Sequence, residues 1–230
     1  MEDILDLQYK NLKIIQDSSG YCFTSDSVLL ANYVKSKHTD IVVEFCAGSG
    51  VISVLLSGKQ KMKHIYAFEI QKKLFDMFEK SVKLNCLEDK ITAINDRLEN
   101  VLNYVPQESV DVVLCNPPYH EGGDKSGKVE VAIATHEVET NLENIVLSAN
   151  KALKFGGKFY MVHRVDRIVD VLSTLRKYKI EPKKICIIFP KLESEPVVFL
   201  LTAIKGGKKG VRMNKVTFAN DFNKSCNIFE

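Results

Sequence analysis

The chain has 230 residues, of which 45% are apolar and 27% are charged. These fractions are close to the averages for globular domains, so a disordered chain is not expected. No apolar stretch approaches the roughly 20 residues needed to cross a bilayer, and the acidic start Met1-Glu2-Asp3 is unlike a secretory signal. The net charge of +3 permits a nucleic-acid partner without arguing for one. A cytoplasmic protein is expected.

The first 40 residues predict an N-terminal extension made of a hairpin and a helix. Residues 9–23 read as the hairpin, in which YKNLKII and YCF are joined by the turn QDSSG. The apolar stretch VLLANYV follows, and Ser25 or Asp26 is expected to cap its helix.

From residue 41 onward, short apolar runs alternate with helical patterns. This alternation indicates a parallel, doubly wound sheet, and the apolar character of whole strands indicates that both faces are covered. The last two strands, 184–190 and 196–204, are separated only by KLESE, which is too short for the parallel crossover of a dozen or more residues. These two strands therefore form an antiparallel hairpin. The preceding elements are the strands 41–46, 64–70, 91–95, 110–115 and 158–164 and the helices 51–58, 71–86, 142–153 and 167–178.

A mostly parallel sheet that ends in such a hairpin resembles the class I methyltransferase fold. The resemblance covers residues 41–205. It implies a Rossmann-like α/β domain with a seven-stranded, mostly parallel sheet and a C-terminal antiparallel hairpin. We therefore expect one domain over residues 1–230, in which a basic tail, 206–230, follows the core.

A glycine-rich turn ends the first core strand, in the segment EFCAGSG. Such a turn lets a ligand approach the backbone closely. A dinucleotide fingerprint, G-x-G-x-x-G, would have a third glycine where this chain has Ser53. Glu44, four residues before Gly48, instead gives the pattern E-x-x-x-G-x-G, with Gly50 last. This pattern resembles the S-adenosylmethionine loop of methyltransferases, in which the turn wraps the methionine moiety and the acid anchors the far side of the pocket.

Acidic residues follow the next two strands. Glu69 ends the second strand, where a carboxylate can accept both ribose hydroxyls, in NAD enzymes as well as in methyltransferases. Asp96 follows the third strand. In methyltransferases of this shape an acid at that place reaches the adenine amine of the cofactor, but a role in capping the loop is equally open.

The segment Asn116-Pro117-Pro118-Tyr119 follows the fourth strand and is similar to the [DN]-P-P-[YFW] motif of amino-methyltransferases. The Asn116 side-chain oxygen and the Pro117 carbonyl can each accept one N–H of an exocyclic amine. The nitrogen then becomes pyramidal and its lone pair points at the methyl group. Tyr119 can stack on the substrate ring. We predict Asn116, Pro117 and Tyr119 as catalytic residues that act by positioning and electrostatics, and Asn116 also as a cofactor contact.

Longer segments resemble the bacterial tRNA(Val) adenine-N6 methyltransferase family. They are YKNLKIIQ (9–16), CFTSDSVLLANY (22–33), EFCAGSG, NPPY and ATHE (134–137), and the likeness extends to about residue 205. It implies methylation of the adenine 3′ of the anticodon in a valine tRNA. An adenine in an unpaired loop costs less to extract than a paired one.

The same resemblance implies roles for several further residues. Phe23 and Thr24 would line the cofactor pocket, and Asp26 would begin the helix over it. Family members often carry an arginine before the His136-Glu137 pair, where this chain has Thr135, so a surface role for that pair stays open.

Two basic segments are candidate RNA contacts. The loop 120–140, with Lys125 and Lys128, could close over the substrate, because it follows the catalytic motif directly. The run 205–215 could contact phosphates, or it could be a solvated surface.

Other functions fit parts of the pattern. The same motif serves N-methylation of an adenine or guanine in rRNA or DNA, or of a protein glutamine amide. About 40 residues before the first core strand are too few for the extra helical domain of glutamine methyltransferases, and no target-recognition domain for DNA is evident. The missing third glycine and the presence of NPPY oppose an NAD-dependent oxidoreductase. The intact NPPY and the acids oppose a non-catalytic RNA-binding module. We expect no metal and no membrane partner, and a monomer.

Overall fold

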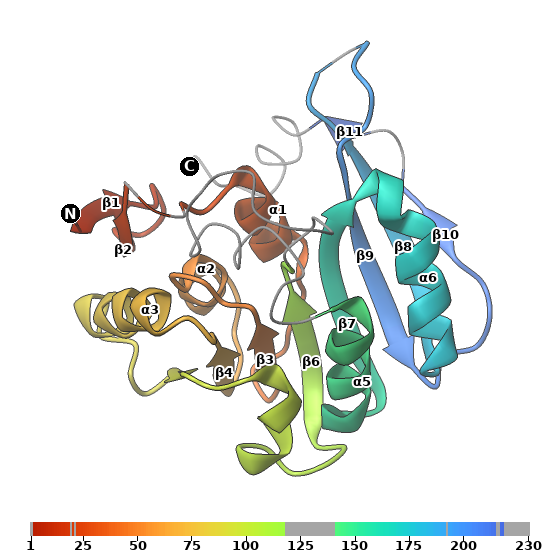
Figure 1. Cartoon of the computed structure of the whole chain (residues 1–230), viewed down its shortest axis with the longest axis horizontal. Coiled ribbons are helices and arrows are strands. Elements are labelled where there is room, and N and C mark those ends of the chain that lie inside the picture. The colour runs from red at the N-terminus through yellow and green to blue at the C-terminus, as the bar shows by residue number, and fades with distance from the viewer. Residues whose placement is uncertain are drawn as a thin grey trace.

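The structure is a computed structural model that describes residues 2–18, 20, 22–117, 141–191, 193–214 and 217–218. Within these residues a nine-stranded sheet runs through the molecule, and a small two-stranded sheet lies beside it (Figure 1). The strands are β1 (Glu2–Asp6), β2 (Lys13–Asp17), β3 (Ile41–Phe45), β4 (His64–Phe68), β5 (Ile91–Ile94), β6 (Val110–Cys115), β7 (Leu153–Arg164), β8 (Ile180–Phe189), β9 (Val198–Lys205), β10 (Arg212–Met213) and β11 (Thr217–Phe218). The helices are α1 (Ser25–Tyr33), α2 (Val51–Lys59), α3 (Lys72–Leu84), α5 (Leu142–Ala152) and α6 (Ile168–Lys177), with 3₁₀ turns η1 (Leu98–Asn103) and η2 (Val165–Arg167). None of the helices in these ranges is long and apolar enough to cross a bilayer.

The order of the main sheet is β10-β8-β9-β7-β6-β3-β4-β5, and β11 also pairs with β8. Strands β3 to β7 pair in parallel, whereas β9 is antiparallel to both of its neighbours, β7 and β8. The mostly parallel sheet and its antiparallel hairpin are therefore confirmed. Two short strands that the sequence did not predict, β10 and β11, lengthen the sheet beside β8.

The two faces of the sheet bury separate apolar clusters. In β3, Val42 belongs to the cluster that also holds residues of α1 and α2, whereas Val43 and Phe45 belong to the cluster that also holds residues of α5 and α6. Because both faces are covered, the central strands β3 and β6 are apolar except for Glu44 and Asp111, respectively. Burial of each such apolar side chain contributes about 1.5–3 kcal/mol to the stability of the fold.

The N-terminal hairpin differs from the one predicted over residues 9–23. Strand β1 pairs antiparallel with β2, with Glu2 opposite Asp17, while residues 22–24 form no strand. The connection between the strands turns through three residues with positive φ, Gln8, Lys10 and Asn11. The segment EDILD was overlooked because it is acidic and mostly exposed. It forms a strand through its pairing with β2.

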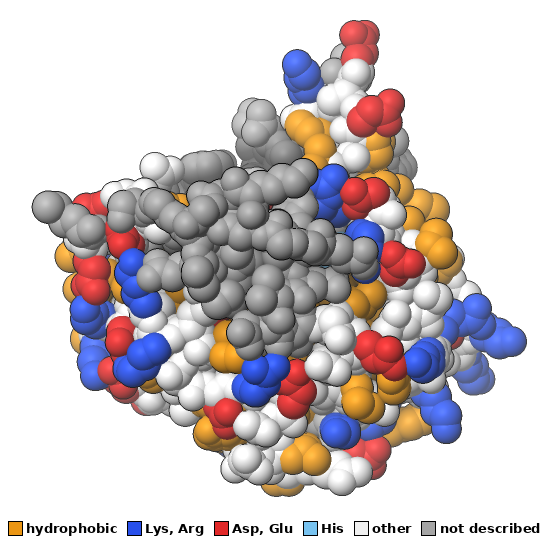
Figure 2. Space-filling view, in the orientation of Figure 1, with side chains coloured by type: hydrophobic (Ala, Val, Ile, Leu, Met, Phe, Trp, Pro, Cys, Tyr) orange, Lys and Arg blue, Asp and Glu red, His pale blue; other side chains and the backbone are white. Residues whose placement is uncertain are grey.

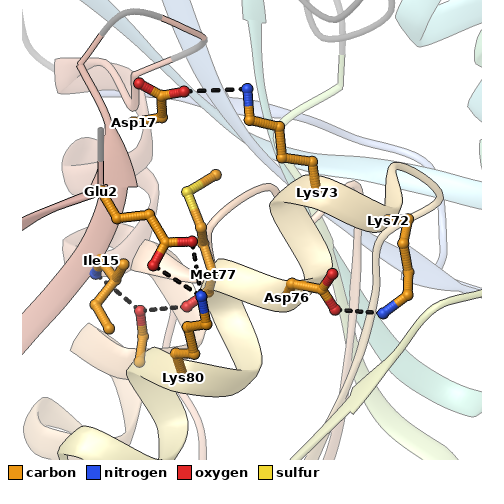
Figure 3. A network of polar contacts seen from close by, with 9 residues as sticks. Glu2, Ile15, Asp17, Lys72, Lys73, Asp76, Met77 and Lys80 are labelled. Carbon is orange, nitrogen blue, oxygen red and sulfur yellow. Dashed lines mark hydrogen bonds and ion pairs between the residues drawn. The ribbon is translucent and has the colours of Figure 1, made fainter.

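This hairpin is held on α3 by polar contacts (Figure 3). The Ile15 N–H donates to Ser81 Oγ at 2.9 Å. Lys73 and Lys80 of α3 form ion pairs with Asp17 (3.0 Å) and Glu2 (2.7 Å), respectively. The Lys80–Glu2 pair is exposed and contributes at most about 1 kcal/mol, whereas the Asp17 carboxylate of the other pair is buried. They orient the hairpin, while buried Ile14 supplies apolar contact with the core.

Helix α1 begins one or two residues earlier than predicted from Ser25 or Asp26 as its cap. Its N-cap is Thr24, so Ser25 and Asp26 lie in the first turn, and no side chain caps the helix by a hydrogen bond. The Ser27 N–H donates to the Thr24 carbonyl at 3.2 Å. The Ser27 side chain is buried.

The basic run that begins at residue 205 starts at the end of β9. Because β9 is antiparallel to β7, this point lies at the edge of the sheet opposite to the carboxyl ends of the parallel strands. Lys and Arg side chains gather on that side of the molecule, near α6 and β10 (Figure 2). Lys208 and Lys209 are exposed, and Lys183 Nζ donates to the carbonyls of Lys208 and Gly210.

Candidate active site

The carboxyl ends of four parallel strands meet at one edge of the sheet (Figure 1). Phe45 at the end of β3 lies opposite Cys115 of β6 and opposite Phe68 of β4, and Phe68 lies opposite Ile94 of β5. The residues that follow these ends are therefore neighbours across the sheet. Ligands of open α/β sheets bind at this edge. The predicted cofactor loop, both strand-end acids and Asn116 all belong to it.

The loop after β3 turns through three residues with positive φ: Cys46 (58°), Gly48 (57°) and Gly50 (86°). The Ala47 N–H donates to the Phe68 carbonyl at 2.9 Å. The Gly48 N–H donates to Glu69 Oε2 at 2.7 Å. These two bonds attach the turn to the end of β4. The positive φ of Cys46 has no signal in the sequence, because a cysteine rarely occupies that region.

Glu44 lies inside β3 and is fully buried. Its Oε2 accepts a hydrogen bond from Ser53 Oγ of α2, whereas Oε1 has no hydrogen-bond partner among the described residues. Burial raises the pKa of Glu44 to about 8, with a smaller contribution from the nearby Glu69 carboxyl. Ser53 occupies the position of the third glycine in a dinucleotide fingerprint. The sequence marked it only as a missing glycine, but its hydroxyl bonds the buried acid.

Glu69 is almost fully buried at the end of β4. Besides the Gly48 N–H, its carboxylate accepts the Gln71 N–H at 2.8 Å. Burial raises the pKa of Glu69, and these backbone hydrogen bonds oppose the rise. Each carboxylate oxygen has two lone pairs, so the group has the capacity to accept two further donors, such as a pair of hydroxyls.

Asp96 is more accessible than the other two acids. It accepts hydrogen bonds from Asn100 Nδ2 (2.8 Å), the Arg97 N–H (2.7 Å) and the Tyr104 hydroxyl (3.1 Å). The bond from Asn100 is the main cause of its lowered pKa. The loop-capping role that the sequence left open is therefore present. Contact with an adenine amine stays a prediction.

Asn116 and Pro117 follow β6 directly. Asn116 is half-buried and Pro117 is buried. Asn116 Nδ2 donates to Ser27 Oγ of α1 at 3.0 Å. The sequence did not single out Ser27. The signal for it in the sequence was a small polar residue on the buried side of an apolar helix.

The remaining predicted positions are described in part. Phe23 is half-buried and packs against the core, and Thr24 is exposed at the start of α1. Tyr119 lies outside the described residues. So do the loop 120–140, with Lys125 and Lys128, and the ATHE segment, with Thr135, His136 and Glu137.

The raised pKa of Glu44 predicts how the stability of the ligand-free protein depends on pH. Between about pH 4.5 and 8 the folded protein keeps the Glu44 proton while the unfolded chain loses it, so the free energy of unfolding falls as pH rises. Glu44→Gln cannot ionise and should flatten this fall, measured as the urea midpoint at several pH values.

The control for this measurement is Glu143→Gln. Glu143 is an exposed carboxyl whose pKa is lowered, chiefly by its hydrogen bond from Lys177. Its replacement should not flatten the fall. Parallel pH profiles for the wild type and Glu44→Gln would contradict the raised pKa of Glu44.

Comparisons with known proteins identify a family and a fold. Residues 19–178 match the family model described as "Methyltransferase small domain". A tRNA1(Val) (adenine(37)-N6)-methyltransferase of Dyadobacter fermentans is 23% identical over 69% of this chain, and the chain spans 65% of that relative. A protein of the same name from Flavobacterium psychrophilum is 22% identical over 86% of this chain and 78% of its own length. Among solved structures, a predicted O-methyltransferase from Agrobacterium tumefaciens has a TM-score of 0.69 at 17% identity, covering 87% of this chain and 96% of its own.

Proposed function

This chain belongs to the methyltransferase small domain family, and from that premise we propose that it methylates the N6 amine of an adenine in tRNA. The proposed target is the adenine 3′ of the anticodon of a valine tRNA. The observation that carries the proposal is the position of Asn116. This residue follows β6 beside the glycine-rich turn, which is where a residue that binds the substrate amine is required. The names of two relatives support the choice of substrate.

S-adenosylmethionine is the methyl donor of this family, and when bound it supplies an electrophilic methyl group on a sulfonium. The buried side chains fit such a molecule. Glu44 offers a buried oxygen that lacks a donor among the described residues, which suits the ammonium of a methionine moiety. Glu69 can accept ribose hydroxyls with its remaining lone pairs. We assign cofactor binding to Phe23, Thr24, Glu44, Gly48, Gly50, Glu69, Asp96 and Asn116.

The chain's own contribution to the chemistry is to hold the amine. An amine conjugated to a ring is a weak nucleophile because its lone pair is delocalised. Asn116 Oδ1 and the Pro117 carbonyl each accept one N–H, so the lone pair becomes available, and Tyr119 stacks on the base. The methylated nitrogen loses its extra proton after transfer, so no general base is required before attack.

The proposal also includes the cellular compartment and the number of chains that act together. Its substrate is a cytoplasmic RNA, and we propose that a single copy of the chain acts as one catalytic domain. Residues 1–40 belong to that domain in this proposal, since the hairpin contacts α3 and α1 packs on the core.

The test is methyl transfer from labelled S-adenosylmethionine to total tRNA that lacks modifications, followed by nucleoside analysis. We expect label in N6-methyladenosine. A valine tRNA transcript should accept it, and the same transcript with the target adenine replaced by guanine should not. Label that appears only in rRNA, in DNA or in a glutamine peptide would reject tRNA as the substrate. Binding of NADH without binding of S-adenosylmethionine would reject the reaction class.

A further inference from the structure

We propose that Cys46 and Cys115 form a redox-sensitive thiol pair at the base of the cofactor turn, and that hydrogen peroxide converts them reversibly into a disulfide that impairs cofactor binding. Cys46 begins the turn after β3, and Cys115 is the last residue of β6, directly before Asn116. Both are free cysteines. The proposed methyl transfer uses neither sulfur, so the thiol pair adds a means of regulation and rests on the proposed function.

The register of the sheet brings the two residues close enough for a disulfide. Phe45 is the partner of Cys115 across the β3–β6 pair, and Cys46 follows Phe45 directly. A strand spacing of about 4.8 Å and a rise of about 3.3 Å per residue place the Cα atoms of Cys46 and Cys115 roughly 6 Å apart. Disulfides usually join Cα atoms that are about 4.4–6.8 Å apart. The bond can therefore form without a large movement of the backbone.

The left-handed backbone of Cys46 brings its thiol to the face of the sheet where Cys115 lies. Side chains alternate along an extended strand, so the residue after Phe45 would face away from the apolar cluster that holds Phe45 and Cys115. Cys46 has a φ of 58° instead, and its side chain packs against that same cluster. The thiols of Cys46 and Cys115 share a hydrogen bond. The two sulfurs are therefore neighbours before any oxidation.

The two thiols differ in accessibility, and this difference sets the order of the reaction. Cys115 is fully buried, and burial raises the pKa of its thiol, which therefore stays protonated. Cys46 is half-buried, so a small oxidant reaches it first. The Cys46 sulfur attacks one oxygen of hydrogen peroxide and the O–O bond breaks. The other oxygen leaves as water with the thiol proton, and Cys46 becomes a sulfenic acid.

The second step forms the disulfide. The Cys115 sulfur attacks the Cys46 sulfur, the S–O bond breaks, and the hydroxyl group leaves as water with the Cys115 proton. In sum, two thiols and one peroxide give one disulfide and two waters. Each sulfur loses one electron, and the two peroxide oxygens gain these electrons. A dithiol reductant restores both thiols by exchange.

The disulfide would displace groups on both sides of the site. Sulfurs that share only a hydrogen bond must come more than about 1 Å closer to reach the roughly 2.0 Å of a disulfide. Cys46 is followed by Ala47, whose N–H donates to the Phe68 carbonyl and attaches the cofactor turn to β4. Cys115 is followed by Asn116. Because a shift of about 1 Å can lower turnover about 100-fold, oxidation should lower methyl transfer by at least about tenfold.

The first arm of the test identifies the bond. The protein is treated with hydrogen peroxide, the remaining thiols are blocked, and its peptides are mapped by mass spectrometry without reduction. We expect a linked pair of peptides that joins Cys46 to Cys115 and disappears after treatment with dithiothreitol. Cys46 found only as a sulfinic acid, or linked to a different cysteine, would overturn the proposal.

The second arm measures the cofactor site. Calorimetric titration with S-adenosylhomocysteine compares the oxidised and reduced samples of each variant, so that a change in the basal affinity does not matter. In the wild type, oxidation should weaken binding by about threefold or more, the effect of at least one lost hydrogen bond, and dithiothreitol should restore it. Cys115→Ala and, separately, Cys46→Ala should not respond to oxidation. The same loss in Cys115→Ala would show that oxidation of Cys46 alone is responsible, and would overturn the pair.

Cys86→Ala is the matched control. Cys86 also has a positive φ, 53°, but it is exposed and follows α3, away from β3 and β6. This variant should respond to peroxide as the wild type does. A disulfide that leaves both cofactor affinity and methyl transfer unchanged would overturn the proposed regulation. If the reduced wild type binds S-adenosylhomocysteine but methylates no adenine in tRNA, the proposed substrate is wrong, and the mapping and the titration still decide on the thiol pair.

Discussion

Replacing Asn116 with alanine is expected to lower methyl transfer to adenine by about 100- to 1,000-fold, the usual effect of deleting one preorganised hydrogen-bonding group from an active site. The amine then keeps its lone pair in conjugation with the ring, and one of its two N–H groups has no acceptor. S-adenosylmethionine should bind within about tenfold of its wild-type affinity, since at most one hydrogen bond to it is lost.

Single-turnover assays and calorimetric titration with the cofactor separate these two effects. Asn103→Ala, an exposed asparagine of η1 outside the site, is the matched control and should behave like the wild type. A variant that loses cofactor binding as severely as turnover would show that Asn116 serves the cofactor first. Full turnover in Asn116→Ala would remove the motif from the chemistry.

Gly50→Ala should reduce the free energy of unfolding by about 2–5 kcal/mol, through two separate costs. Gly50 has a φ of 86°, where an L-residue with a Cβ is strained by roughly 1–2 kcal/mol. A Cβ at this position would also lie 1.9 Å from the ring of Phe78, which is fully buried and cannot move aside. Overpacking of this kind costs about 1–3 kcal/mol.

The chain contains a control that isolates the first cost. Gly156 has a φ of 79°, but nothing lies within 4 Å of an added Cβ, so Gly156→Ala should show only the backbone strain. Urea unfolding of the two variants gives the comparison. Equal destabilisation would mean that the Phe78 ring yields to the added methyl group, so that only the backbone strain remains.

How far the sequence predicted the fold depends on where each element gets its stability. Strand β6 was predicted at its observed bounds, because all of its residues except Asp111 are apolar and buried. Strand β1 was missed because its residues are mostly exposed and acidic, and it forms through pairing with β2. Strands β10 and β11 have two residues each and depend on the edge of β8. A pattern within a short window of the sequence does not reveal the strands with which these elements pair.

The candidate site follows the same rule. The sequence predicted Glu44, Glu69 and Asn116 from strand ends and motifs, and the structure places them at one edge of the parallel sheet, while their roles stay predictions. The hydrogen bonds of Ser27 and Ser53 were not predicted, since each serine hydroxyl bonds one side chain of another element. The exchange of a glycine for Ser53 was visible in the sequence. Its reason, a bond to a buried carboxyl, needed the structure.

The order of synthesis delays the docking of the N-terminal hairpin on α3. Lys80 lies 78 residues after its partner Glu2, and Asn85 lies 72 residues after its partner Lys13. At translation rates of about 5–20 residues per second, the first residues leave the ribosome roughly 4–16 seconds before their docking surface exists. During that interval β1 and β2 have only each other, and an isolated two-stranded hairpin is marginally stable in water. The first part of the chain to be made therefore waits until α3 has been synthesised before it acquires these neighbours.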